Sequence, residues 1–183
     1  MTERVPDNYS MVYSALYIDY MVDKVASDIN RWISLHSLQA KSKPIMCLCV
    51  LKGAVHFFND LMKRITGKIE YGFIQPKSYI NNQQLEDITI LEHNLDVLNR
   101  RIILVDDIMD TGDTIYKLSK CLYKEGAKYV ASAALIHRKG AQKADVSPGW
   151  ACIEHEGDEW FVGYGMDDCE FNRNLRNIYK LER

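Results

Sequence analysis

Apolar residues follow two different spacings along the chain, and the two spacings alternate. Short continuous apolar runs, which predict buried strands, are separated by stretches in which apolar residues recur every three or four positions, as on one face of a helix. Between residues 14 and 38, for example, Leu16, Tyr20, Val25 and Ile29 recur close to helical spacing. The pattern predicts strands at residues 45–51, 69–74, 101–107 and 129–137, and helices at residues 14–38, 54–65 and 114–124.

The alternation of strands and helices predicts an α/β fold with a mainly parallel, twisted sheet flanked by helices. No internal repeat or linker divides the sequence, so we expect a single domain over residues 1–183. Residues 75–94 are polar, with weak strand character only near Ile88–Leu91, and we expect a flexible lid there. Ligands bind beyond the carboxyl ends of the strands in such sheets. Lys52–Gly53 and Asp106–Thr114 both fall at strand ends of this kind.

The sequence ILVDDIMDTGDT (residues 103–114) carries an apolar strand directly into four acidic residues. A solvated turn, whose acids favour the N-terminus of the next helix, would explain one or two of them. It would not explain the adjacent Asp106 and Asp107 at the strand end. Carboxylates there suit sugar hydroxyls or Mg²⁺, while the turn Asp110–Thr114 aims backbone N–H groups and hydroxyls at a phosphate. The pattern therefore favours a phosphorylated sugar as the ligand. The sequence contains neither a P-loop nor a dinucleotide-binding glycine motif.

Composition excludes several classes of protein but identifies no catalytic or ligand-binding residue. The chain has 183 residues, of which 47% are hydrophobic and 26% charged, as in ordinary globular domains. A net charge of −2 offers no basic surface for nucleic acid or an anionic membrane. The polar start MTERVPDNYS does not resemble a signal peptide. The spacing of Cys47 and Cys49 lacks the paired pattern of a zinc site, so we expect free buried thiols in a cytoplasmic protein.

Four segments together resemble the hypoxanthine-guanine phosphoribosyltransferases, which belong to the type I phosphoribosyltransferase family. The apolar strand, two acids and D-T-G-x-T of residues 102–114 resemble the ribosyl-phosphate-binding signature shared by that whole family. Three more segments are similar to the pyrophosphate-binding loop (VLKGA, residues 50–54), the start of the flexible lid (KSY, residues 77–79) and the purine-binding segment (WFVGYGMD, residues 160–167, followed by Arg173). The last of these narrows the resemblance to transferases of 6-oxopurines.

The resemblance implies a type I phosphoribosyltransferase fold with a purine-binding hood segment at about residues 150–183. It implies purine salvage: transfer of phosphoribose from phosphoribosyl pyrophosphate to hypoxanthine or guanine, giving IMP or GMP and pyrophosphate. Mg²⁺ is the implied cofactor, and Asp110 the implied catalytic base facing N7 of the purine. A non-proline cis peptide at Leu51–Lys52 is also implied.

The same resemblance assigns contacts to individual residues. The implied ligands of the ribose and its phosphate are Asp106, Asp107, Ile108, Met109, Asp110, Thr111, Gly112, Asp113 and Thr114; those of pyrophosphate are Lys52, Gly53 and Arg173; those of the purine are His137, Trp160, Phe161 and Asp167; those of the metal are Asp106, Asp107 and Asp167; and the lid residues are Ser78 and Tyr79. Without the resemblance, Lys52 and Arg173 would be taken for surface cations and Trp160 for a core residue.

Two positions depart from the family's pattern. His137, in LIHRK, stands where the family usually has a lysine that contacts the 6-oxo group of the purine, and Asp113 stands where many members carry lysine or asparagine. Because residues i and i+2 of a strand share a face, Lys139 is the alternative to His137. We favour His137, since the preceding AALI aligns without a gap. The substitution leaves the base specificity open.

Two alternative functions also stay open at this point. One is a transferase of xanthine or another purine, because the position that distinguishes xanthine is read by backbone groups. The other, of a different class, is an RNA-binding regulator on the same fold, which would need a basic face. We expect small-molecule substrates, no nucleic-acid or membrane partner, and assembly as a homodimer or homotetramer.

Overall fold

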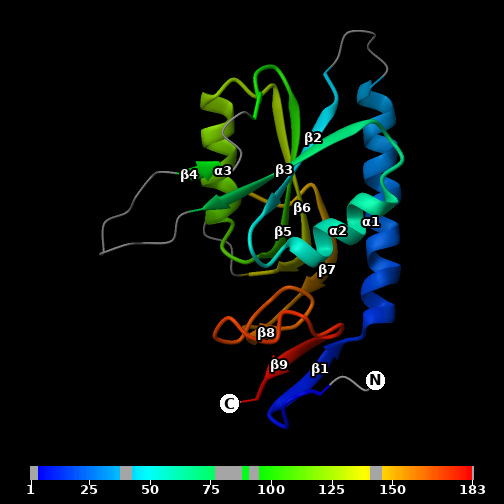
Figure 1. Ribbon diagram of the computed structural model, residues 1–183, viewed down its shortest axis with the longest axis vertical. Helices are drawn as coiled ribbons and strands as arrows, with labels where there is room; N and C mark the ends of the chain where they lie inside the picture. The colour runs from blue at the N-terminus through cyan, green and yellow to red at the C-terminus, as the bar shows by residue number, and fades with distance from the viewer. Residues whose placement is uncertain (1–3, 38–42, 77–87, 91–94, 141–145, 183) are drawn as a thin grey trace.

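A large sheet of six strands forms the centre of the molecule (Figure 1). The structure is a computed structural model, and it describes residues 4–37, 43–76, 88–90, 95–140 and 146–182. The strands of this sheet are β2 (Ile45–Val50), β3 (Ile69–Pro76), β4 (Ile88–Ile90), β5 (Arg101–Met109), β6 (Tyr129–Arg138) and β7 (Trp150–His155). They lie in the order β4-β3-β2-β5-β6-β7. All neighbours from β3 to β7 are parallel, and only the edge strand β4 is antiparallel. The predicted mainly parallel sheet is confirmed.

Helices cover both faces of this sheet. Two of them, α1 (Ala15–Ser37) and α2 (Val55–Arg64), pack on one face, and α3 (Asp113–Lys124) packs on the other (Figure 1). Alternate residues of β2 therefore enter different cores: Cys47 and Cys49 pack under α1 and α2, and Leu48 packs under α3. A strand buried on both faces needs a continuous apolar run, which is what the sequence of β2 provides.

The two cysteines of β2 are free and fully buried, as expected. Burial raises the pKa of both thiols to about 12. They are therefore uncharged packing residues at neutral pH.

A second, antiparallel sheet lies at one end of the large one (Figure 1). It consists of β1 (Tyr9–Tyr13), β9 (Ile178–Leu181) and β8 (Phe161–Val162), in that order. The apolar pattern did not predict β1, β8 or β9, nor β7 of the large sheet. The hood segment that the family resemblance implies at about residues 150–183 contains β7 of the large sheet as well as β8 and β9 of the small one.

The expected lid residues Ser78 and Tyr79 lie outside the described residues, as does most of the stretch 75–94. Among the helices that the structure describes, none is long and apolar enough to cross a membrane.

Parallel pairing brings the carboxyl ends of β2, β5 and β6 to one edge of the large sheet. Cys49 of β2 pairs with Val105 of β5, and Asp106 of β5 pairs with Ala134 of β6. The segments that follow these strands, beginning at Leu51, Asp110 and Lys139, are therefore neighbours. Two of the three are the segments in which the sequence predicted chemistry.

Candidate active site

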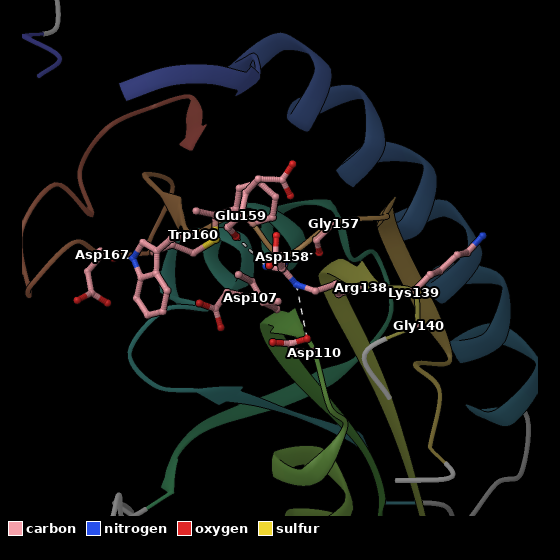
Figure 2. A pocket seen from close by; sticks show the side chains of 13 residues that line it. Asp107, Asp110, Arg138, Lys139, Gly140, Gly157, Asp158, Glu159, Trp160 and Asp167 are labelled. Carbon is pink, nitrogen blue, oxygen red and sulfur yellow. Dashed lines mark hydrogen bonds and ion pairs between the residues drawn. The ribbon is translucent and has the colours of Figure 1, made fainter. Parts of the chain in front are cut away.

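A cavity of about 820 Å³ opens between the carboxyl ends of β5 and β6 and the segment that leads into the small sheet. This volume lies within the range of small-molecule sites, roughly 300–1,000 Å³. Figure 2 shows Asp107, Asp110 and Arg138 approaching the cavity from the strand ends, with Trp160 and Asp167 across from Arg138. The walls also include Ile108, Lys139, Gly140, Gly157, Asp158, Glu159, Phe161 and Met166.

The adjacent acids of β5 lie at the base of this site. Asp106 is 6% exposed, and its Oδ1 accepts the backbone N–H of Asp107 at 3.1 Å. Burial raises the pKa of Asp106 well above its ordinary value, and the nearby Asp107 carboxylate raises it further. Burial also raises the pKa of Asp107, although the hydrogen bond with Asp106 and the charge of Arg173 oppose this shift. Asp107 lines the cavity, so the pair presents a carboxylate that favours a cation or hydroxyl groups as its partner.

The turn from Asp110 to Thr114 joins β5 to α3. Gly112 has a φ of +80°, a left-handed conformation that glycine adopts without strain, and α3 begins at the next residue. The N–H of Asp113 donates to Oγ1 of Thr111 at 3.3 Å. The turn therefore ends in the N-terminus of α3, whose N–H groups favour an anion such as phosphate. Next to the turn, Met109 is buried in the α3 core, so it is a packing residue.

The loop after β2 is pressed against the acids. A Cβ atom on Gly53 would lie 1.8 Å from Oδ2 of Asp107, and one on Gly165 would lie 2.0 Å from the carbonyl oxygen of Gly53. A larger residue at position 53 would displace the Asp107 side chain, and one at position 165 would displace the Gly53 backbone, so the loop lies tightly between Asp107 and the turn at Gly165. The expected cis peptide at Leu51–Lys52 is present.

Lys52 and Arg173 meet at a single carboxylate. Glu170 accepts from Nζ of Lys52 and from Nη2 of Arg173, both at 3.2 Å. Arg173 also pairs with Oδ1 of Asp167 at 2.8 Å and donates to the carbonyl oxygen of Gly165 at 2.8 Å. The two cations expected to bind pyrophosphate are thus brought together, and an acidic side chain that the sequence did not single out bridges them.

Trp160 and Phe161 take different positions. Trp160 is 53% exposed, and its ring N–H donates to the carbonyl oxygen of Asp167 at 2.8 Å, so the indole forms a wall of the cavity. Phe161 is 3% exposed, and its ring lies 5.2 Å from the guanidinium carbon of Arg138. An exposed aromatic face suits a flat base. Phe161 instead supports the arginine.

His137 does not lie in this cavity. It lines a separate one with Tyr17 and Met21 of α1. The strand register explains why: Met109, the last residue of β5, pairs with His137, so the residue that follows, Asp110, lies beside Arg138. The alternative, Lys139, forms an ion pair with Glu154, and its side chain points away from the centre of the cavity (Figure 2). Arg138 is thus a wall residue that the sequence analysis missed, because the sequence alone does not give the register of β6 against β5.

These features match one family. The chain belongs to the phosphoribosyl transferase family, because the model of the phosphoribosyl transferase domain matches residues 21–168. Among curated relatives, the hypoxanthine-guanine phosphoribosyltransferase of Staphylococcus epidermidis is 30% identical over 144 residues, covering 78% of this chain and 80% of the relative. The Staphylococcus aureus enzyme of that name is 28% identical over the same shares.

Solved structures agree on the fold. A hypoxanthine-guanine phosphoribosyltransferase from Bacillus anthracis superposes with a TM-score of 0.81 at 25% identity, covering 93% of this chain and 97% of that one. A Trypanosoma cruzi hypoxanthine phosphoribosyltransferase superposes with a TM-score of 0.86 at 20% identity, covering 98% and 94%. The predicted type I phosphoribosyltransferase fold is confirmed.

Proposed function

We propose that this protein is a purine salvage enzyme that transfers phosphoribose from phosphoribosyl pyrophosphate to hypoxanthine or guanine. The observation that carries the proposal is the meeting of three parts at one strand edge: the acids Asp106 and Asp107, the turn Asp110–Thr114, and the loop at Lys52–Gly53. They meet in a chain of the phosphoribosyl transferase family whose curated relatives are named hypoxanthine-guanine phosphoribosyltransferases.

The sugar phosphate would bind along the carboxyl end of β5. The carboxylates of Asp106 and Asp107 would accept hydrogen bonds from the ribose hydroxyls. The turn from Asp110 to Thr114 would surround the 5′-phosphate with hydroxyls and with the backbone N–H groups that open α3. Because the turn follows the acids directly, the ribose and its phosphate would be fixed by one continuous segment.

The leaving pyrophosphate would lie on the loop after β2. Lys52 and Arg173 would neutralise it, with the backbone of Gly53 alongside. In the structure both cations already point at one acceptor, the carboxylate of Glu170. Charge placed where the leaving group develops its own charge lowers the barrier to breaking the bond between C1′ and the pyrophosphate oxygen.

The purine would enter between Trp160 and the end of β5. Its N9 would form the new bond to C1′, and the carboxylate of Asp110 would accept the proton from N7, which relieves the positive charge left on the ring. Asp110 and Trp160 line the same cavity, Asp110 at the end of β5. A positioned carboxylate is well suited to this proton transfer.

Mg²⁺ fits the donors that the cavity offers. Among the described residues no group of three or more metal-ligating side chains gathers. Mg²⁺ does not require one, because it is commonly held by one or two carboxylates, with substrate phosphates and water completing its shell. Asp106 and Asp107 on one side, and Asp167 on the other, would supply those carboxylates. When bound, the ion would neutralise charge on the departing pyrophosphate.

A steady-state assay with four purines tests the proposal. Hypoxanthine, guanine, xanthine and adenine would each be supplied with phosphoribosyl pyrophosphate and Mg²⁺, and both nucleotide and pyrophosphate would be measured. We expect turnover of hypoxanthine and guanine with equal amounts of nucleotide and pyrophosphate. Turnover of none of the four purines would refute the proposal. Turnover of xanthine alone would mean that xanthine, and not hypoxanthine or guanine, is the purine substrate.

Assembly and location stay predictions. We expect a homodimer or homotetramer in the cytoplasm. Sedimentation equilibrium of the purified protein measures the first, and fractionation of the source cells the second.

A further inference from the structure

The first strand of the chain, β1, is connected to two different segments of the cavity wall. It pairs with β9 in the small sheet (Figure 1), and the hydroxyl groups of two of its residues, Tyr9 and Tyr13, bond to side chains far away in the sequence. We call residues 156–160 the purine loop and residues 167–173 the cation turn, after the ligands proposed for them. Both segments supply residues that line the cavity.

Tyr9 bonds to both ends of the cation turn. Its hydroxyl donates to Oδ2 of Asp168 at 2.7 Å and accepts from Nδ2 of Asn172 at 2.9 Å. Burial raises the pKa of Tyr9, and the hydrogen bond with Asp168 raises it further, so the hydroxyl keeps its proton at neutral pH. One oxygen atom thus connects the residues on either side of Glu170.

The backbone of the cation turn is strained. Asp168 and Phe171 exchange both of their backbone hydrogen bonds, at 3.1 and 2.9 Å, across a tight two-residue turn. Its central residues, Cys169 and Glu170, have φ values of +51° and +71°, which residues other than glycine, asparagine and aspartate seldom adopt. Such a conformation persists only where the surroundings enforce it. The turn therefore depends on its outside contacts, and the Tyr9 hydroxyl is one that spans it from end to end.

The shape of this turn sets the position of the groups proposed for pyrophosphate and Mg²⁺. The N–H of Glu170 donates to Oδ2 of Asp167 at 2.8 Å, and Oδ1 of the same carboxylate pairs with Arg173 at 2.8 Å. The carboxylate of Glu170 also accepts from Lys52. A change in the turn would therefore move a proposed metal ligand and both pyrophosphate cations together.

Tyr13 reaches the purine loop through one histidine. Its hydroxyl bonds to Nδ1 of His155 at 2.6 Å, and Nε2 of that ring bonds to the carboxylate of Glu159 at 2.8 Å. A carboxylate can only accept, so Nε2 carries the proton that faces Glu159, and Nδ1 accepts from Tyr13. The hydrogen bond with His155 lowers the pKa of Glu159, and burial raises the pKa of Tyr13, which agrees with these roles.

This chain of hydrogen bonds ends beside the indole proposed to stack on the purine. Glu159 directly precedes Trp160, and both line the cavity (Figure 2). The ring of His155 also packs edge-on against Phe161, the residue after Trp160, with the ring centroids 4.9 Å apart. The histidine therefore contacts the residues on both sides of the indole.

We propose that Tyr9 and Tyr13 are positioning residues, one for each substrate, an inference that rests on the proposed function. Tyr9 fixes the cation turn for phosphoribosyl pyrophosphate, and Tyr13 fixes the purine loop for the base. Neither side chain is among the described residues that line the cavity, so both act through the segments that they hold. A wall that is already in place lowers the cost of ordering it when the ligand binds.

Single substitutions of the two tyrosines test the inference, because each variant is the control for the other. Tyr9→Phe and Tyr13→Phe each remove one hydroxyl and keep the ring, and Tyr71→Phe repeats the change at an exposed position of β3. The measurements are kcat and the KM for phosphoribosyl pyrophosphate and for hypoxanthine, each at saturation with the other substrate. Hydrogen exchange of the ligand-free protein, followed by mass spectrometry of the two segments, adds a readout that needs no turnover.

We expect Tyr9→Phe to raise the KM for phosphoribosyl pyrophosphate at least about threefold and to change the KM for hypoxanthine much less. Tyr13→Phe should show the reverse pattern. His155→Phe breaks the same chain of bonds at its centre, so it should resemble Tyr13→Phe, whereas Tyr71→Phe should change neither KM. A general loss of stability cannot produce opposite patterns, because KM does not depend on how much of a preparation is folded.

The exchange measurement should show the same division. Backbone amides of the cation turn should exchange faster in Tyr9→Phe, and those of the purine loop should exchange faster in Tyr13→Phe. Three results would overturn the inference: two unaltered KM values in both tyrosine variants, the same pattern in both, or a lower KM for phosphoribosyl pyrophosphate in Tyr9→Phe. If the wild-type protein turns over no purine, the proposed function fails, while the exchange rates still decide whether each tyrosine holds its own segment.

Discussion

Asp110 is the single side chain on which the proposed chemistry depends most. Replacement by asparagine keeps the shape of the side chain but removes the base that accepts the purine proton. We expect Asp110→Asn to lower kcat by about 10²–10⁴ while the protein stays folded, the usual effect of losing a general base. Steady-state kinetics with hypoxanthine measure it, and Asp28→Asn, at an exposed position of α1, is the control. Near-normal kcat in Asp110→Asn would remove the carboxylate from the mechanism.

The buried acid Asp106 makes the stability of the metal-free protein depend on pH. Burial raises its pKa, so the native state keeps this proton at pH values where the unfolded chain has lost it. Its contribution to stability is therefore complete below the unfolded pKa, about 3.9, and is lost as the pH rises through the native pKa.

Substitution of the same acid tests this dependence. Asparagine at position 106 can still accept the N–H of Asp107 but never ionises. We expect Asp106→Asn to raise the Tm of chelator-treated protein by about 3 °C or more at pH 8, and to change it little at pH 4. Thermal unfolding followed by circular dichroism at the two pH values measures the difference. An equal change at both would contradict the assignment.

The residues of the site differ in how far the sequence could predict them. Asp106, Asp107 and the turn after them could be found, because four acids directly after an apolar strand are costly to bury unless a cation or hydroxyl groups bind them. Arg138 could not be found by matching letters along β6, since nothing in LIHRK says which residue faces the cavity. That depends on the register of β6 against β5, which aligns Met109 with His137 and so brings Arg138 beside Asp110. The role of Glu170 likewise arises only when the chain folds back on Lys52.

At the scale of segments, the loop after β2 and the segment from Asp167 to Arg173 form one charged unit. Glu170 occupies the cations that pyrophosphate would need, and both ion pairs are exposed, so water and salt screen them and each is weak. The substrate must displace this carboxylate. We therefore expect Glu170→Gln to lower the KM for phosphoribosyl pyrophosphate by about two- to tenfold with little change in kcat.

Initial rates at saturating hypoxanthine measure the KM of each variant. Glu125→Gln, the same substitution at the C-terminal end of α3, is the control for a general change in surface charge. A higher KM in Glu170→Gln would instead mean that Glu170 orients Lys52 and Arg173 for the substrate.

The helices and strands, like the site residues, divide into those that the local sequence pattern predicts and those that depend on tertiary contacts. Elements that bury a continuous or periodic apolar pattern were predicted within about two residues: the helix expected at 54–65 spans Val55–Arg64, and the strand expected at 129–137 spans Tyr129–Arg138. The strands β1, β7, β8 and β9 were missed. They are two to six residues long, and β1 pairs with β9 across almost the whole chain, so tertiary contacts rather than local pattern define β1 and β9.

At the scale of the whole molecule, the site should couple the stability of the large sheet to its substrate. Asp107, the turn Asp110–Thr114 and the loop at Lys52 come from two strands and reach one ligand only in the folded state. A ligand at 100 times its Kd stabilises a protein by about 2.7 kcal/mol, which for a domain of this size raises the Tm by about 5–10 °C.

We expect phosphoribosyl pyrophosphate to produce such a shift with Mg²⁺ present and a much smaller one with excess chelator, because the carboxylates and the pyrophosphate repel each other without a cation. Differential scanning fluorimetry of the wild type and Asp107→Asn measures both conditions. The variant should lose most of the shift, since half of the acidic pair is gone, and an identical shift with and without Mg²⁺ would show that the acids bind the substrate without a metal.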